Sequence, residues 1–289
     1  LGEYRQAFKK SNLILDAGFT KGYKKTSPTK TSGSKSHLFT KFIKNFEGND
    51  NSKNNIELSL QKISNKKYLK LYKVKTDLVE YETDTLENSL SFTKENDDFF
   101  FGFKTSVFES LKDNYNDRYE YILPEVILDK NLFTSNKFGN VDFQSNLKVH
   151  NYDTNIFKKF FVNNFDWKYR NINYKSGITG NFLGKLKNVN YEVKNDSVYK
   201  RDNTSELFGA LGYLAKIDFV KKTKNDTDHI LTPKALFKYS PNHMRKSSND
   251  VRLNHLNIFS LDRLNSSDNF ESGANATLGF DYKLKNLDK

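Results

Sequence analysis

The chain has 289 residues, of which 36% are hydrophobic and 15% aromatic, and it carries a formal net charge of +12 without any cysteine. The lack of cysteine excludes disulfides, thiolate metal sites and a thiol nucleophile. The absence of an apolar run of about eighteen residues excludes a transmembrane helix. The mean hydropathy of -0.77 is low for a soluble core of this size, whereas a sheet with one face in water needs only its other face apolar.

The charge excess comes from 47 Lys and Arg against 35 Asp and Glu. Such an excess indicates a polyanionic partner, for which nucleic acid, anionic lipid headgroups and lipopolysaccharide phosphates are the candidates. The Lys residues are spread evenly over the loops, so a simple compositional bias explains the excess equally well.

Short segments in which apolar and polar residues alternate follow one another along the first half of the chain, and this period predicts β-strands. Segments 56–61 and 68–74 are predicted to form a hairpin through a tight turn, and Pro124 is predicted to interrupt the strand over 119–128. The predicted strands of this half are 4–8, 13–21, 38–46, 56–61, 68–74, 86–93, 99–108 and 119–128.

The second half continues the pattern, with strands predicted over 141–150, 157–170, 178–186 and 207–219, and a final pair around a long loop. Segment 157–170 has two apolar clusters separated by two Asn and is predicted to contain a bulge. Residues 187–204 are predicted to be a polar loop. The last strand, 273–284, shows the clearest alternation and runs ten to twelve residues, against ~5–6 in soluble sheets and ~9–11 for a strand that crosses a bilayer.

Alternation assigns side chains to two faces in the two clearest strands. We expect the apolar set to face lipid and the polar set to face a wet interior. The outward set is Phe143, Leu147, Val149, Leu278, Phe280 and Tyr282, and the inward set is Asp142, Gln144, Asn146, Lys148, Asn275 and Asp281.

Together these segments predict an all-β fold: an antiparallel meander of 13–14 long strands that is part of a large transmembrane outer-membrane β-barrel. Short turns alternate with longer polar loops, which is typical of strands that cross a membrane. We expect residues 1–289 to be a fragment of one barrel domain whose first and last strands are not paired with each other.

Two prolines and one loop stand out as candidate functional features. Pro124 and Pro233 each remove a ladder hydrogen bond from a strand, which marks either a bulge or strand end, or a strand pair weakened so that it can part. The loop 242–272 is long for a hairpin, and loops of this length in compact structures are functional or disordered. We expect it to fold back over or into the interior, with Phe259 packed as an anchor and Arg263 paired to a carboxylate. The candidate partners are Asp262, Asp268 and Glu271.

No catalytic chemistry is indicated. The five histidines do not fall at metal-ligand spacing, the carboxylates are scattered, and no Gly-rich phosphate loop occurs. We therefore expect no enzyme activity, no metal and no cofactor.

The order and spacing of several short motifs resemble the LptD (OstA/Imp) family of lipopolysaccharide-assembly outer-membrane proteins, in the C-terminal barrel region. The strongest set lies between Leu231 and Tyr282, and the remaining motifs extend the resemblance over nearly the whole chain. The motifs are Leu231-Thr232-Pro233-Lys234, Tyr239-Ser240-Pro241, Asn257-x-Phe259, Asp262-Arg263, Asp268-x-x-Glu271-x-Gly273, Tyr4-Arg5-Gln6, Ser64 to Leu69, Asp117-Arg118-Tyr119 with Pro124, and Asn188 to Glu192.

The resemblance implies a translocation protein rather than an enzyme, located in the outer membrane of a Gram-negative cell. It implies lipopolysaccharide and outer-membrane lipids as ligands, a plug lipoprotein (LptE) as partner, and contact with the periplasmic Lpt bridge proteins through a jelly-roll domain that this segment lacks. A general porin or TonB-type receptor barrel is the alternative, because strand periodicity does not separate kinds of barrel. A soluble basic β-sheet protein that binds nucleic acid is the remaining reading, and the resemblance implies no nucleic-acid partner.

Overall fold

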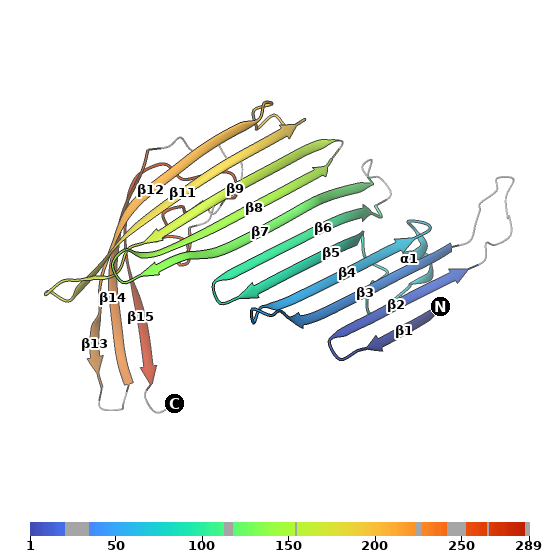
Figure 1. Cartoon of the computed structure of the whole chain (residues 1–289), viewed down its shortest axis with the longest axis horizontal. Coiled ribbons are helices and arrows are strands. Elements are labelled where there is room, and N and C mark those ends of the chain that lie inside the picture. The colour runs from blue at the N-terminus through green and yellow to red at the C-terminus, as the bar shows by residue number, and fades with distance from the viewer. Residues whose placement is uncertain are drawn as a thin grey trace. The chain divides into compact units, whose positions relative to one another are not determined.

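The computed structural model describes residues 1–20, 35–112, 118–153, 155–223, 227–241, 253–264 and 266–286. Over these residues the chain is an antiparallel meander of 15 strands with one short helix (Figure 1). The strands are β1 (Gly2–Ala7), β2 (Ser11–Thr20), β3 (Lys35–Glu47), β4 (Lys53–Ile63), β5 (Thr85–Asn96), β6 (Phe99–Ser110), β7 (Tyr119–Ser135), β8 (Gly139–Tyr152), β9 (Ile156–Lys168), β10 (Ile172–Asn173), β11 (Ile178–Lys194), β12 (Thr204–Ile217), β13 (Phe219–Lys222), β14 (Thr227–Ser240) and β15 (Gly273–Asn286).

The all-β antiparallel meander is confirmed. The strand order is β1-β2-β3-β4-β5-β6-β7-β8-β9-β11-β12-β14-β13, and β15 pairs with the other edge of β14. The strand count exceeds the expected 13–14 because β10 and β13 are separate short segments of two and four residues. Within the described ranges β1 pairs only with β2 and β15 only with β14, so no ladder joins the first strand to the last.

The chain divides into two compact units, each described here by itself. Unit 1 comprises Leu1–Leu128, Asn146–Phe161 and Tyr191–Thr204, and unit 2 comprises Asp129–Ser145, Val162–Asn190 and Ser205–Lys289.

In unit 1 the hairpin predicted between 56–61 and 68–74 is wrong. Helix α1 (Tyr68–Tyr72) occupies the second segment, and β4 pairs instead with β3 and β5. Tyr68 and Leu69 are both buried in one cluster with Phe39. Consecutive residues of a strand point to opposite faces, so only a helical turn brings both side chains into the same core. The helix found here is too short and polar to cross a membrane, and no other helix occurs in the described residues.

A buried polar chain attaches α1 to the sheet of unit 1. The hydroxyl of Tyr68 lies 3.1 Å from Nδ1 of His37 on β3, and Nε2 of the same ring lies 2.5 Å from Oδ1 of Asp16 on β2. Because all three groups are bonded, burying them does not leave an unsatisfied polar atom.

Two expectations about strand boundaries need correction. Strand β7 continues through Pro124 to Ser135, so this proline, which follows a cis Leu123–Pro124 bond, does not interrupt it. Strand β9 covers most of the segment predicted as a strand over 157–170, and the bulge expected there stays a prediction. The polar loop predicted over 187–204 is wrong in its first eight residues, because β11 extends to Lys194.

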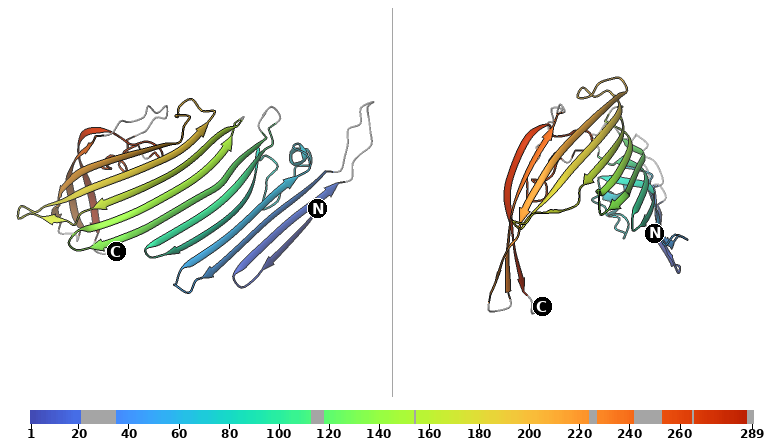
Figure 2. Two further views of the ribbon diagram at one scale, coloured as in Figure 1. Left: turned by 45° about the horizontal axis from the view of Figure 1, so that its top comes forward. Right: turned by 60° about the vertical axis from the view of Figure 1, so that its left-hand side comes forward.

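In unit 2, β14 and β15 pair over fourteen residues and lie side by side in both views of Figure 2. Along its opposite edge, β14 pairs through residues 234–239 with β12 and through residues 228–231 with β13. Gly273 opens β15 with φ of +99°, a conformation that other residues adopt only with strain, which accounts for glycine at the point where the long loop joins the strand.

Candidate functional site

Pairing of β12, β13, β14 and β15 sets their side chains in rows across the strands, and on one side of the sheet these rows are apolar. We call this side the open face. Five successive rows contain Leu211, Tyr239 and Ala274; Tyr213, Phe237 and Ala276; Ala215, Ala235 and Leu278; Pro233 and Phe280; and Phe219, Leu231 and Tyr282. Leu278 is 77% exposed and Phe280 69% exposed. The outward-facing set expected for β15 therefore lies together on one exposed apolar surface.

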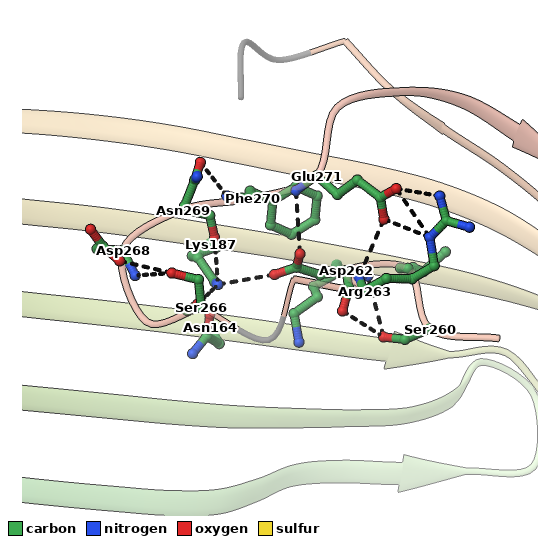
Figure 3. Close-up of polar contacts among 12 residues, drawn as sticks. Asn164, Lys187, Ser260, Asp262, Arg263, Ser266, Asp268, Asn269, Phe270 and Glu271 are labelled. Atoms are coloured by element: carbon green, nitrogen blue, oxygen red, sulfur yellow. Dashed lines mark hydrogen bonds and ion pairs between the residues drawn. The ribbon is translucent and has the colours of Figure 1, made fainter. Parts of the chain in front are cut away.

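The other side of the same strands is polar, and the segment that joins β14 to β15 packs against it (Figure 3). We call this side the covered face and the segment, described over 253–264 and 266–272, the β14–β15 loop. The remainder of the loop, 242–252 and 265, lies outside the described residues. As expected, the loop folds back onto the sheet.

Lys187 on β11 and Asp262 in the loop form a buried ion pair. Their side chains are 4% and 3% exposed, and Nζ lies 3.1 Å from Oδ2. Nζ also donates to the carbonyl oxygens of Asn269, at 3.0 Å, and Ser266. All three ammonium protons thus have acceptors in the loop, which offsets the cost of burying the charge.

Lys238 on β14 makes a second buried attachment, to Glu271. Lys238 is 1% exposed, donates to Glu271 Oε2 and also donates to the carbonyl oxygen of Leu261 at 2.9 Å. Glu271 accepts from Arg263 as well, with Nε 2.9 Å from Oε2. Arg263 continues to Asn275 on β15, whose Oδ1 accepts from Nη2 at 2.9 Å. The carboxylate expected for Arg263 is therefore Glu271.

Apolar side chains fill the space between these polar attachments. Phe270 is fully buried and stacks on Phe208 of β12 at a centroid distance of 6.1 Å. Leu261 lies over Gly212, where a Cβ would come within 2.5 Å of Leu261 Cδ2. Glycine at 212 therefore gives the loop room to approach the sheet.

The aromatic anchor expected in the loop is also in place. Phe259 lies against Gly279 of β15, where a Cβ would be 3.0 Å from the ring. Lys234 of β14 lies over the ring, with Nζ 4.5 Å from its centroid, a favourable cation–π distance. Phe259 is therefore held by the backbone of one strand and the charge of another.

The other loop residues that the sequence singled out support the loop from within. Asn257 Oδ1 accepts from the amide of Asn254 at 2.9 Å, and its Nδ2 donates to the carbonyl of Arg263 at 3.4 Å. Asp268 accepts from the hydroxyl of Ser266 at 2.8 Å. These contacts lie inside the loop and help to shape it, and Asp268 also acts electrostatically on Lys187 of β11.

The residues expected to face a wet interior lie among polar partners. On β15, Asp281 is three residues after Leu278 and therefore lies on the opposite side of the strand. Asp281 pairs with Lys234 at 2.8 Å, and on β8 Asp142 accepts from Asn131 at 2.8 Å. The remaining β8 contacts are Asn164 Nδ2 to Gln144 at 3.4 Å and Lys148 to Glu125 at 3.5 Å, while Asn146 is half-buried.

The apolar side chains of β8 alternate with these polar ones. Phe143 packs on Phe165 of β9, with ring centroids 4.7 Å apart, and Phe165 is exposed like the apolar residues of β15. Leu147 and Val149 follow at the same parity and are half-buried. Strand parity thus separates the two sets on β8 as it does on β15.

Pro233 lies where β14 loses its partner on one edge. Lys234 pairs with β12, whereas Leu231 pairs with β13. Asp218 separates β12 from β13 in the chain and belongs to neither strand. Thr232 donates from its hydroxyl to the Asp218 carboxylate at 2.6 Å. A residue without an N–H therefore stands beside the break in the neighbouring strand, as the bulge-or-end interpretation of this proline requires.

Lys187 and Lys238 are the functional residues that the sequence did not single out. Neither differs in its local context from the many other lysines of the chain, and Lys187 begins the stretch that was predicted to be a loop. Val189, Tyr191 and Val193 alternate with polar residues, and the structure buries all three. This alternation was the signal that could have placed Lys187 in a strand.

Glu271 has an unusual acidity for a partly buried carboxyl. Burial alone would raise its pKa, but the hydrogen bonds and charges of Arg263 and Lys238 outweigh burial and lower the pKa from 4.5 to about 2. Because the folded pKa is depressed, the stability that this carboxylate contributes is fully present above the unfolded value and is lost as the pH falls through the folded one.

We therefore expect the loop to loosen between about pH 4.5 and about pH 2. The protection factors of the backbone amides of 259–264, which compare each exchange rate with that of an unstructured amide at the same pH, should fall over this range, because a protonated Glu271 no longer balances two cations. The Glu271→Gln variant serves as control and should show low protection factors at both ends of the range. Equal protection of the wild-type loop at both ends would show that the carboxylate does not hold it.

The arrangement combines an exposed apolar face with a polar face on which fixed charges hold a folded loop. Among the described residues no group of three or more His, Asp or Glu side chains is placed to hold a metal ion. Comparison with protein-family models and with curated proteins found no match for this chain.

Proposed function

We propose that this chain forms part of the β-barrel of an outer-membrane protein that assembles lipopolysaccharide, with its open face in lipid and its covered face toward a water-filled lumen. The observation that carries the proposal is the set of five apolar rows across β12, β13, β14 and β15, which back onto a polar face. An exposed apolar surface of this extent is characteristic of a membrane or partner interface.

The height of the apolar rows fits a bilayer. Successive rows are two residues apart, so five rows span about 27 Å along a strand at ~3.4 Å per residue. A strand tilt of roughly 40° reduces this to about 20 Å along the membrane normal, close to the ~25 Å apolar band of outer-membrane barrels. No Lys, Arg, Asp or Glu occurs in these rows, so the face lacks the cations that a nucleic-acid surface uses.

The charge of the chain supports a role in moving a large polar anion. At the loop attachment the three cations Lys187, Lys238 and Arg263 are balanced by Asp262, Glu271 and Asp268, so the excess lies in the chain as a whole. In a lumen, the net charge of +12 would attract the phosphorylated sugars of lipopolysaccharide while its acyl chains stay in lipid. The role is binding and translocation without catalysis.

The motif resemblance to the LptD family supplies the partners of this proposal: lipopolysaccharide, a plug lipoprotein of the LptE kind and the periplasmic Lpt bridge proteins. We expect the tagged protein, purified from outer membranes in mild detergent, to carry a stoichiometric lipoprotein. A photo-crosslinking residue at Asp281 on the polar side should label lipopolysaccharide more strongly than one at Phe280. Purification without a lipoprotein and without lipopolysaccharide crosslinks would refute the proposal.

A general porin or TonB-type receptor is the second candidate, favoured by the β14–β15 loop itself. A loop fixed against the lumen wall by ion pairs would narrow a pore and set its charge selectivity. Planar-bilayer recording separates the two candidates, because a porin should show steady conductance that changes with Lys238→Glu, whereas a plugged translocation barrel should conduct little.

A further inference from the structure

The open face of unit 2 is not flat. Two adjoining grooves of about 660 and 670 Å³ share Trp167, Leu211 and Tyr239. Their depth comes from small residues set between large ones: Gly184 and Gly209 line one groove, and Ala274 and Ala276 line the other. Together they form one trough on the open face, of a size that accommodates a small ligand.

Two of the polar aromatic side chains around the trough, Trp167 and Tyr213, are already hydrogen-bonded within the protein. Trp167 Nε1 donates to the carbonyl of Phe138 at 2.9 Å, and the Tyr213 hydroxyl bonds that of Tyr174 at 2.9 Å. The side chains of Lys238 and Asn275, whose residues line one groove, are engaged on the covered face. An occupant therefore gains by burying apolar surface, which fits hydrocarbon. A protein partner would bring about one hydrogen bond per 100–200 Å² and would leave its polar groups unsatisfied here.

Two cations lie near Trp167, the residue that both grooves share. Lys137 lies over the ring of Phe138 at 5.2 Å, and Arg170 lies over the ring of Tyr169 at 5.9 Å. Tyr169 in turn contacts Trp167 edge-on, with centroids 5.9 Å apart. In the described part of the chain neither cation forms an ion pair with a carboxylate, so both are available to an anion.

We propose that the trough binds one acyl chain of an anionic phospholipid, with the lipid phosphate at Lys137 and Arg170. The inference rests on the proposed function only in placing the open face in lipid. It goes further in assigning a fixed site to one lipid, where an ordinary lipid-facing surface would exchange all lipids alike.

The chain contains a single tryptophan, and that residue lines both grooves, so its fluorescence reports on the trough. We would insert the full chain into phosphatidylcholine vesicles and add phosphatidylglycerol brominated at mid-chain, which quenches tryptophan on contact. Quenching should saturate at a low mole fraction of brominated phosphatidylglycerol. It should need about fivefold more lipid for each of Lys137→Ser and Arg170→Ser, since one surface cation contributes about 1 kcal/mol to binding an anionic lipid.

The second part of the experiment fills the trough with a larger side chain. Ala276→Leu should abolish the saturable quenching, whereas Ala235→Leu, the same change on the same face outside both grooves, should leave it unchanged. Quenching that simply follows the bulk fraction of brominated lipid, alike in all variants, would overturn the lipid site and leave the proposed function standing. A tryptophan that no brominated lipid quenches, while water-soluble acrylamide does, would overturn the membrane placement itself.

Discussion

Replacing Asp262 with Ala should lower the free energy of unfolding by about 3–5 kcal/mol and release the β14–β15 loop from the sheet. The substitution leaves Lys187 buried without its carboxylate, at a site where both side chains are less than 5% exposed. An uncompensated buried charge is what makes removal of one partner so costly, because the ammonium keeps only the two carbonyl acceptors. The loss should appear in urea unfolding and as rapid tryptic cleavage after Arg263.

A paired replacement distinguishes the charge effect from a packing effect. The double variant Lys187→Met with Asp262→Leu removes both charges and keeps apolar volume, so it should be more stable than Asp262→Ala, although the carbonyls of Ser266 and Asn269 and the amide of Glu271 lose their partners. Asp268→Ala is a control in the same loop, since this carboxylate is half-buried, accepts from the hydroxyl of Ser266 and, among the described residues, makes no ion pair as close as that of Asp262 with Lys187; it should cost about 1 kcal/mol, well below Asp262→Ala. If the single and double variants at 187 and 262 are equally unstable, the ion pair is not what holds the loop.

The second large effect is expected on the open face. Leu278 lies in the middle of the five apolar rows and is 77% exposed. Leu278→Arg should cost about 2–4 kcal/mol for the chain folded in phospholipid vesicles, because a charge at mid-depth of a bilayer must be drawn toward the interface or hydrated by a membrane defect.

Asp281→Arg is the control on the opposite side of the same strand. It breaks an exposed ion pair with Lys234 and should cost less than about 1 kcal/mol. The size of the cost is itself a further check, because an exposed Leu→Arg substitution on a surface in water changes the free energy of unfolding very little. If the two variants lower the free energy of unfolding equally in vesicles, the open face does not lie in the membrane, and the main support for the barrel is lost.

The failures of the sequence-based predictions have a common physical origin. Segment 68–74 was predicted as the return strand of a hairpin, although its apolar residues do not alternate with Lys70 and Lys73. Tyr68 and Leu69 are both buried in the core of unit 1, which a helical turn allows and a strand does not. The stretch after 187 was judged by its many polar residues, although Val189 and Val193 alternate through it and are buried. In both places burial by distant strands decided the outcome.

For the candidate site, the sequence reached the loop and its principal residues but not its attachments. The charge pattern offered Arg263 three carboxylates and no means of choosing, because the choice depends on where a folded loop turns. The structure assigns Glu271 to Arg263 and Lys238, and leaves Asp262 to Lys187. Lys187 and Asp262 are 75 residues apart in the chain, so their pairing follows from strand order and not from any local signal.

The sequence by itself determined the two-sided character of the strands, because the side-chain period of an extended chain is two whatever its neighbours are. Alternation thus placed Leu278 opposite Asp281, and Phe143 opposite Asp142, before any partner strand was known. Only the tertiary structure decided which strands pair, that the break between β12 and β13 falls beside Pro233, and that two lysines from β11 and β14 hold the loop. These features depend on contacts between residues far apart in the chain, and their energy comes from burial and charge pairing that exist only once the sheet has formed.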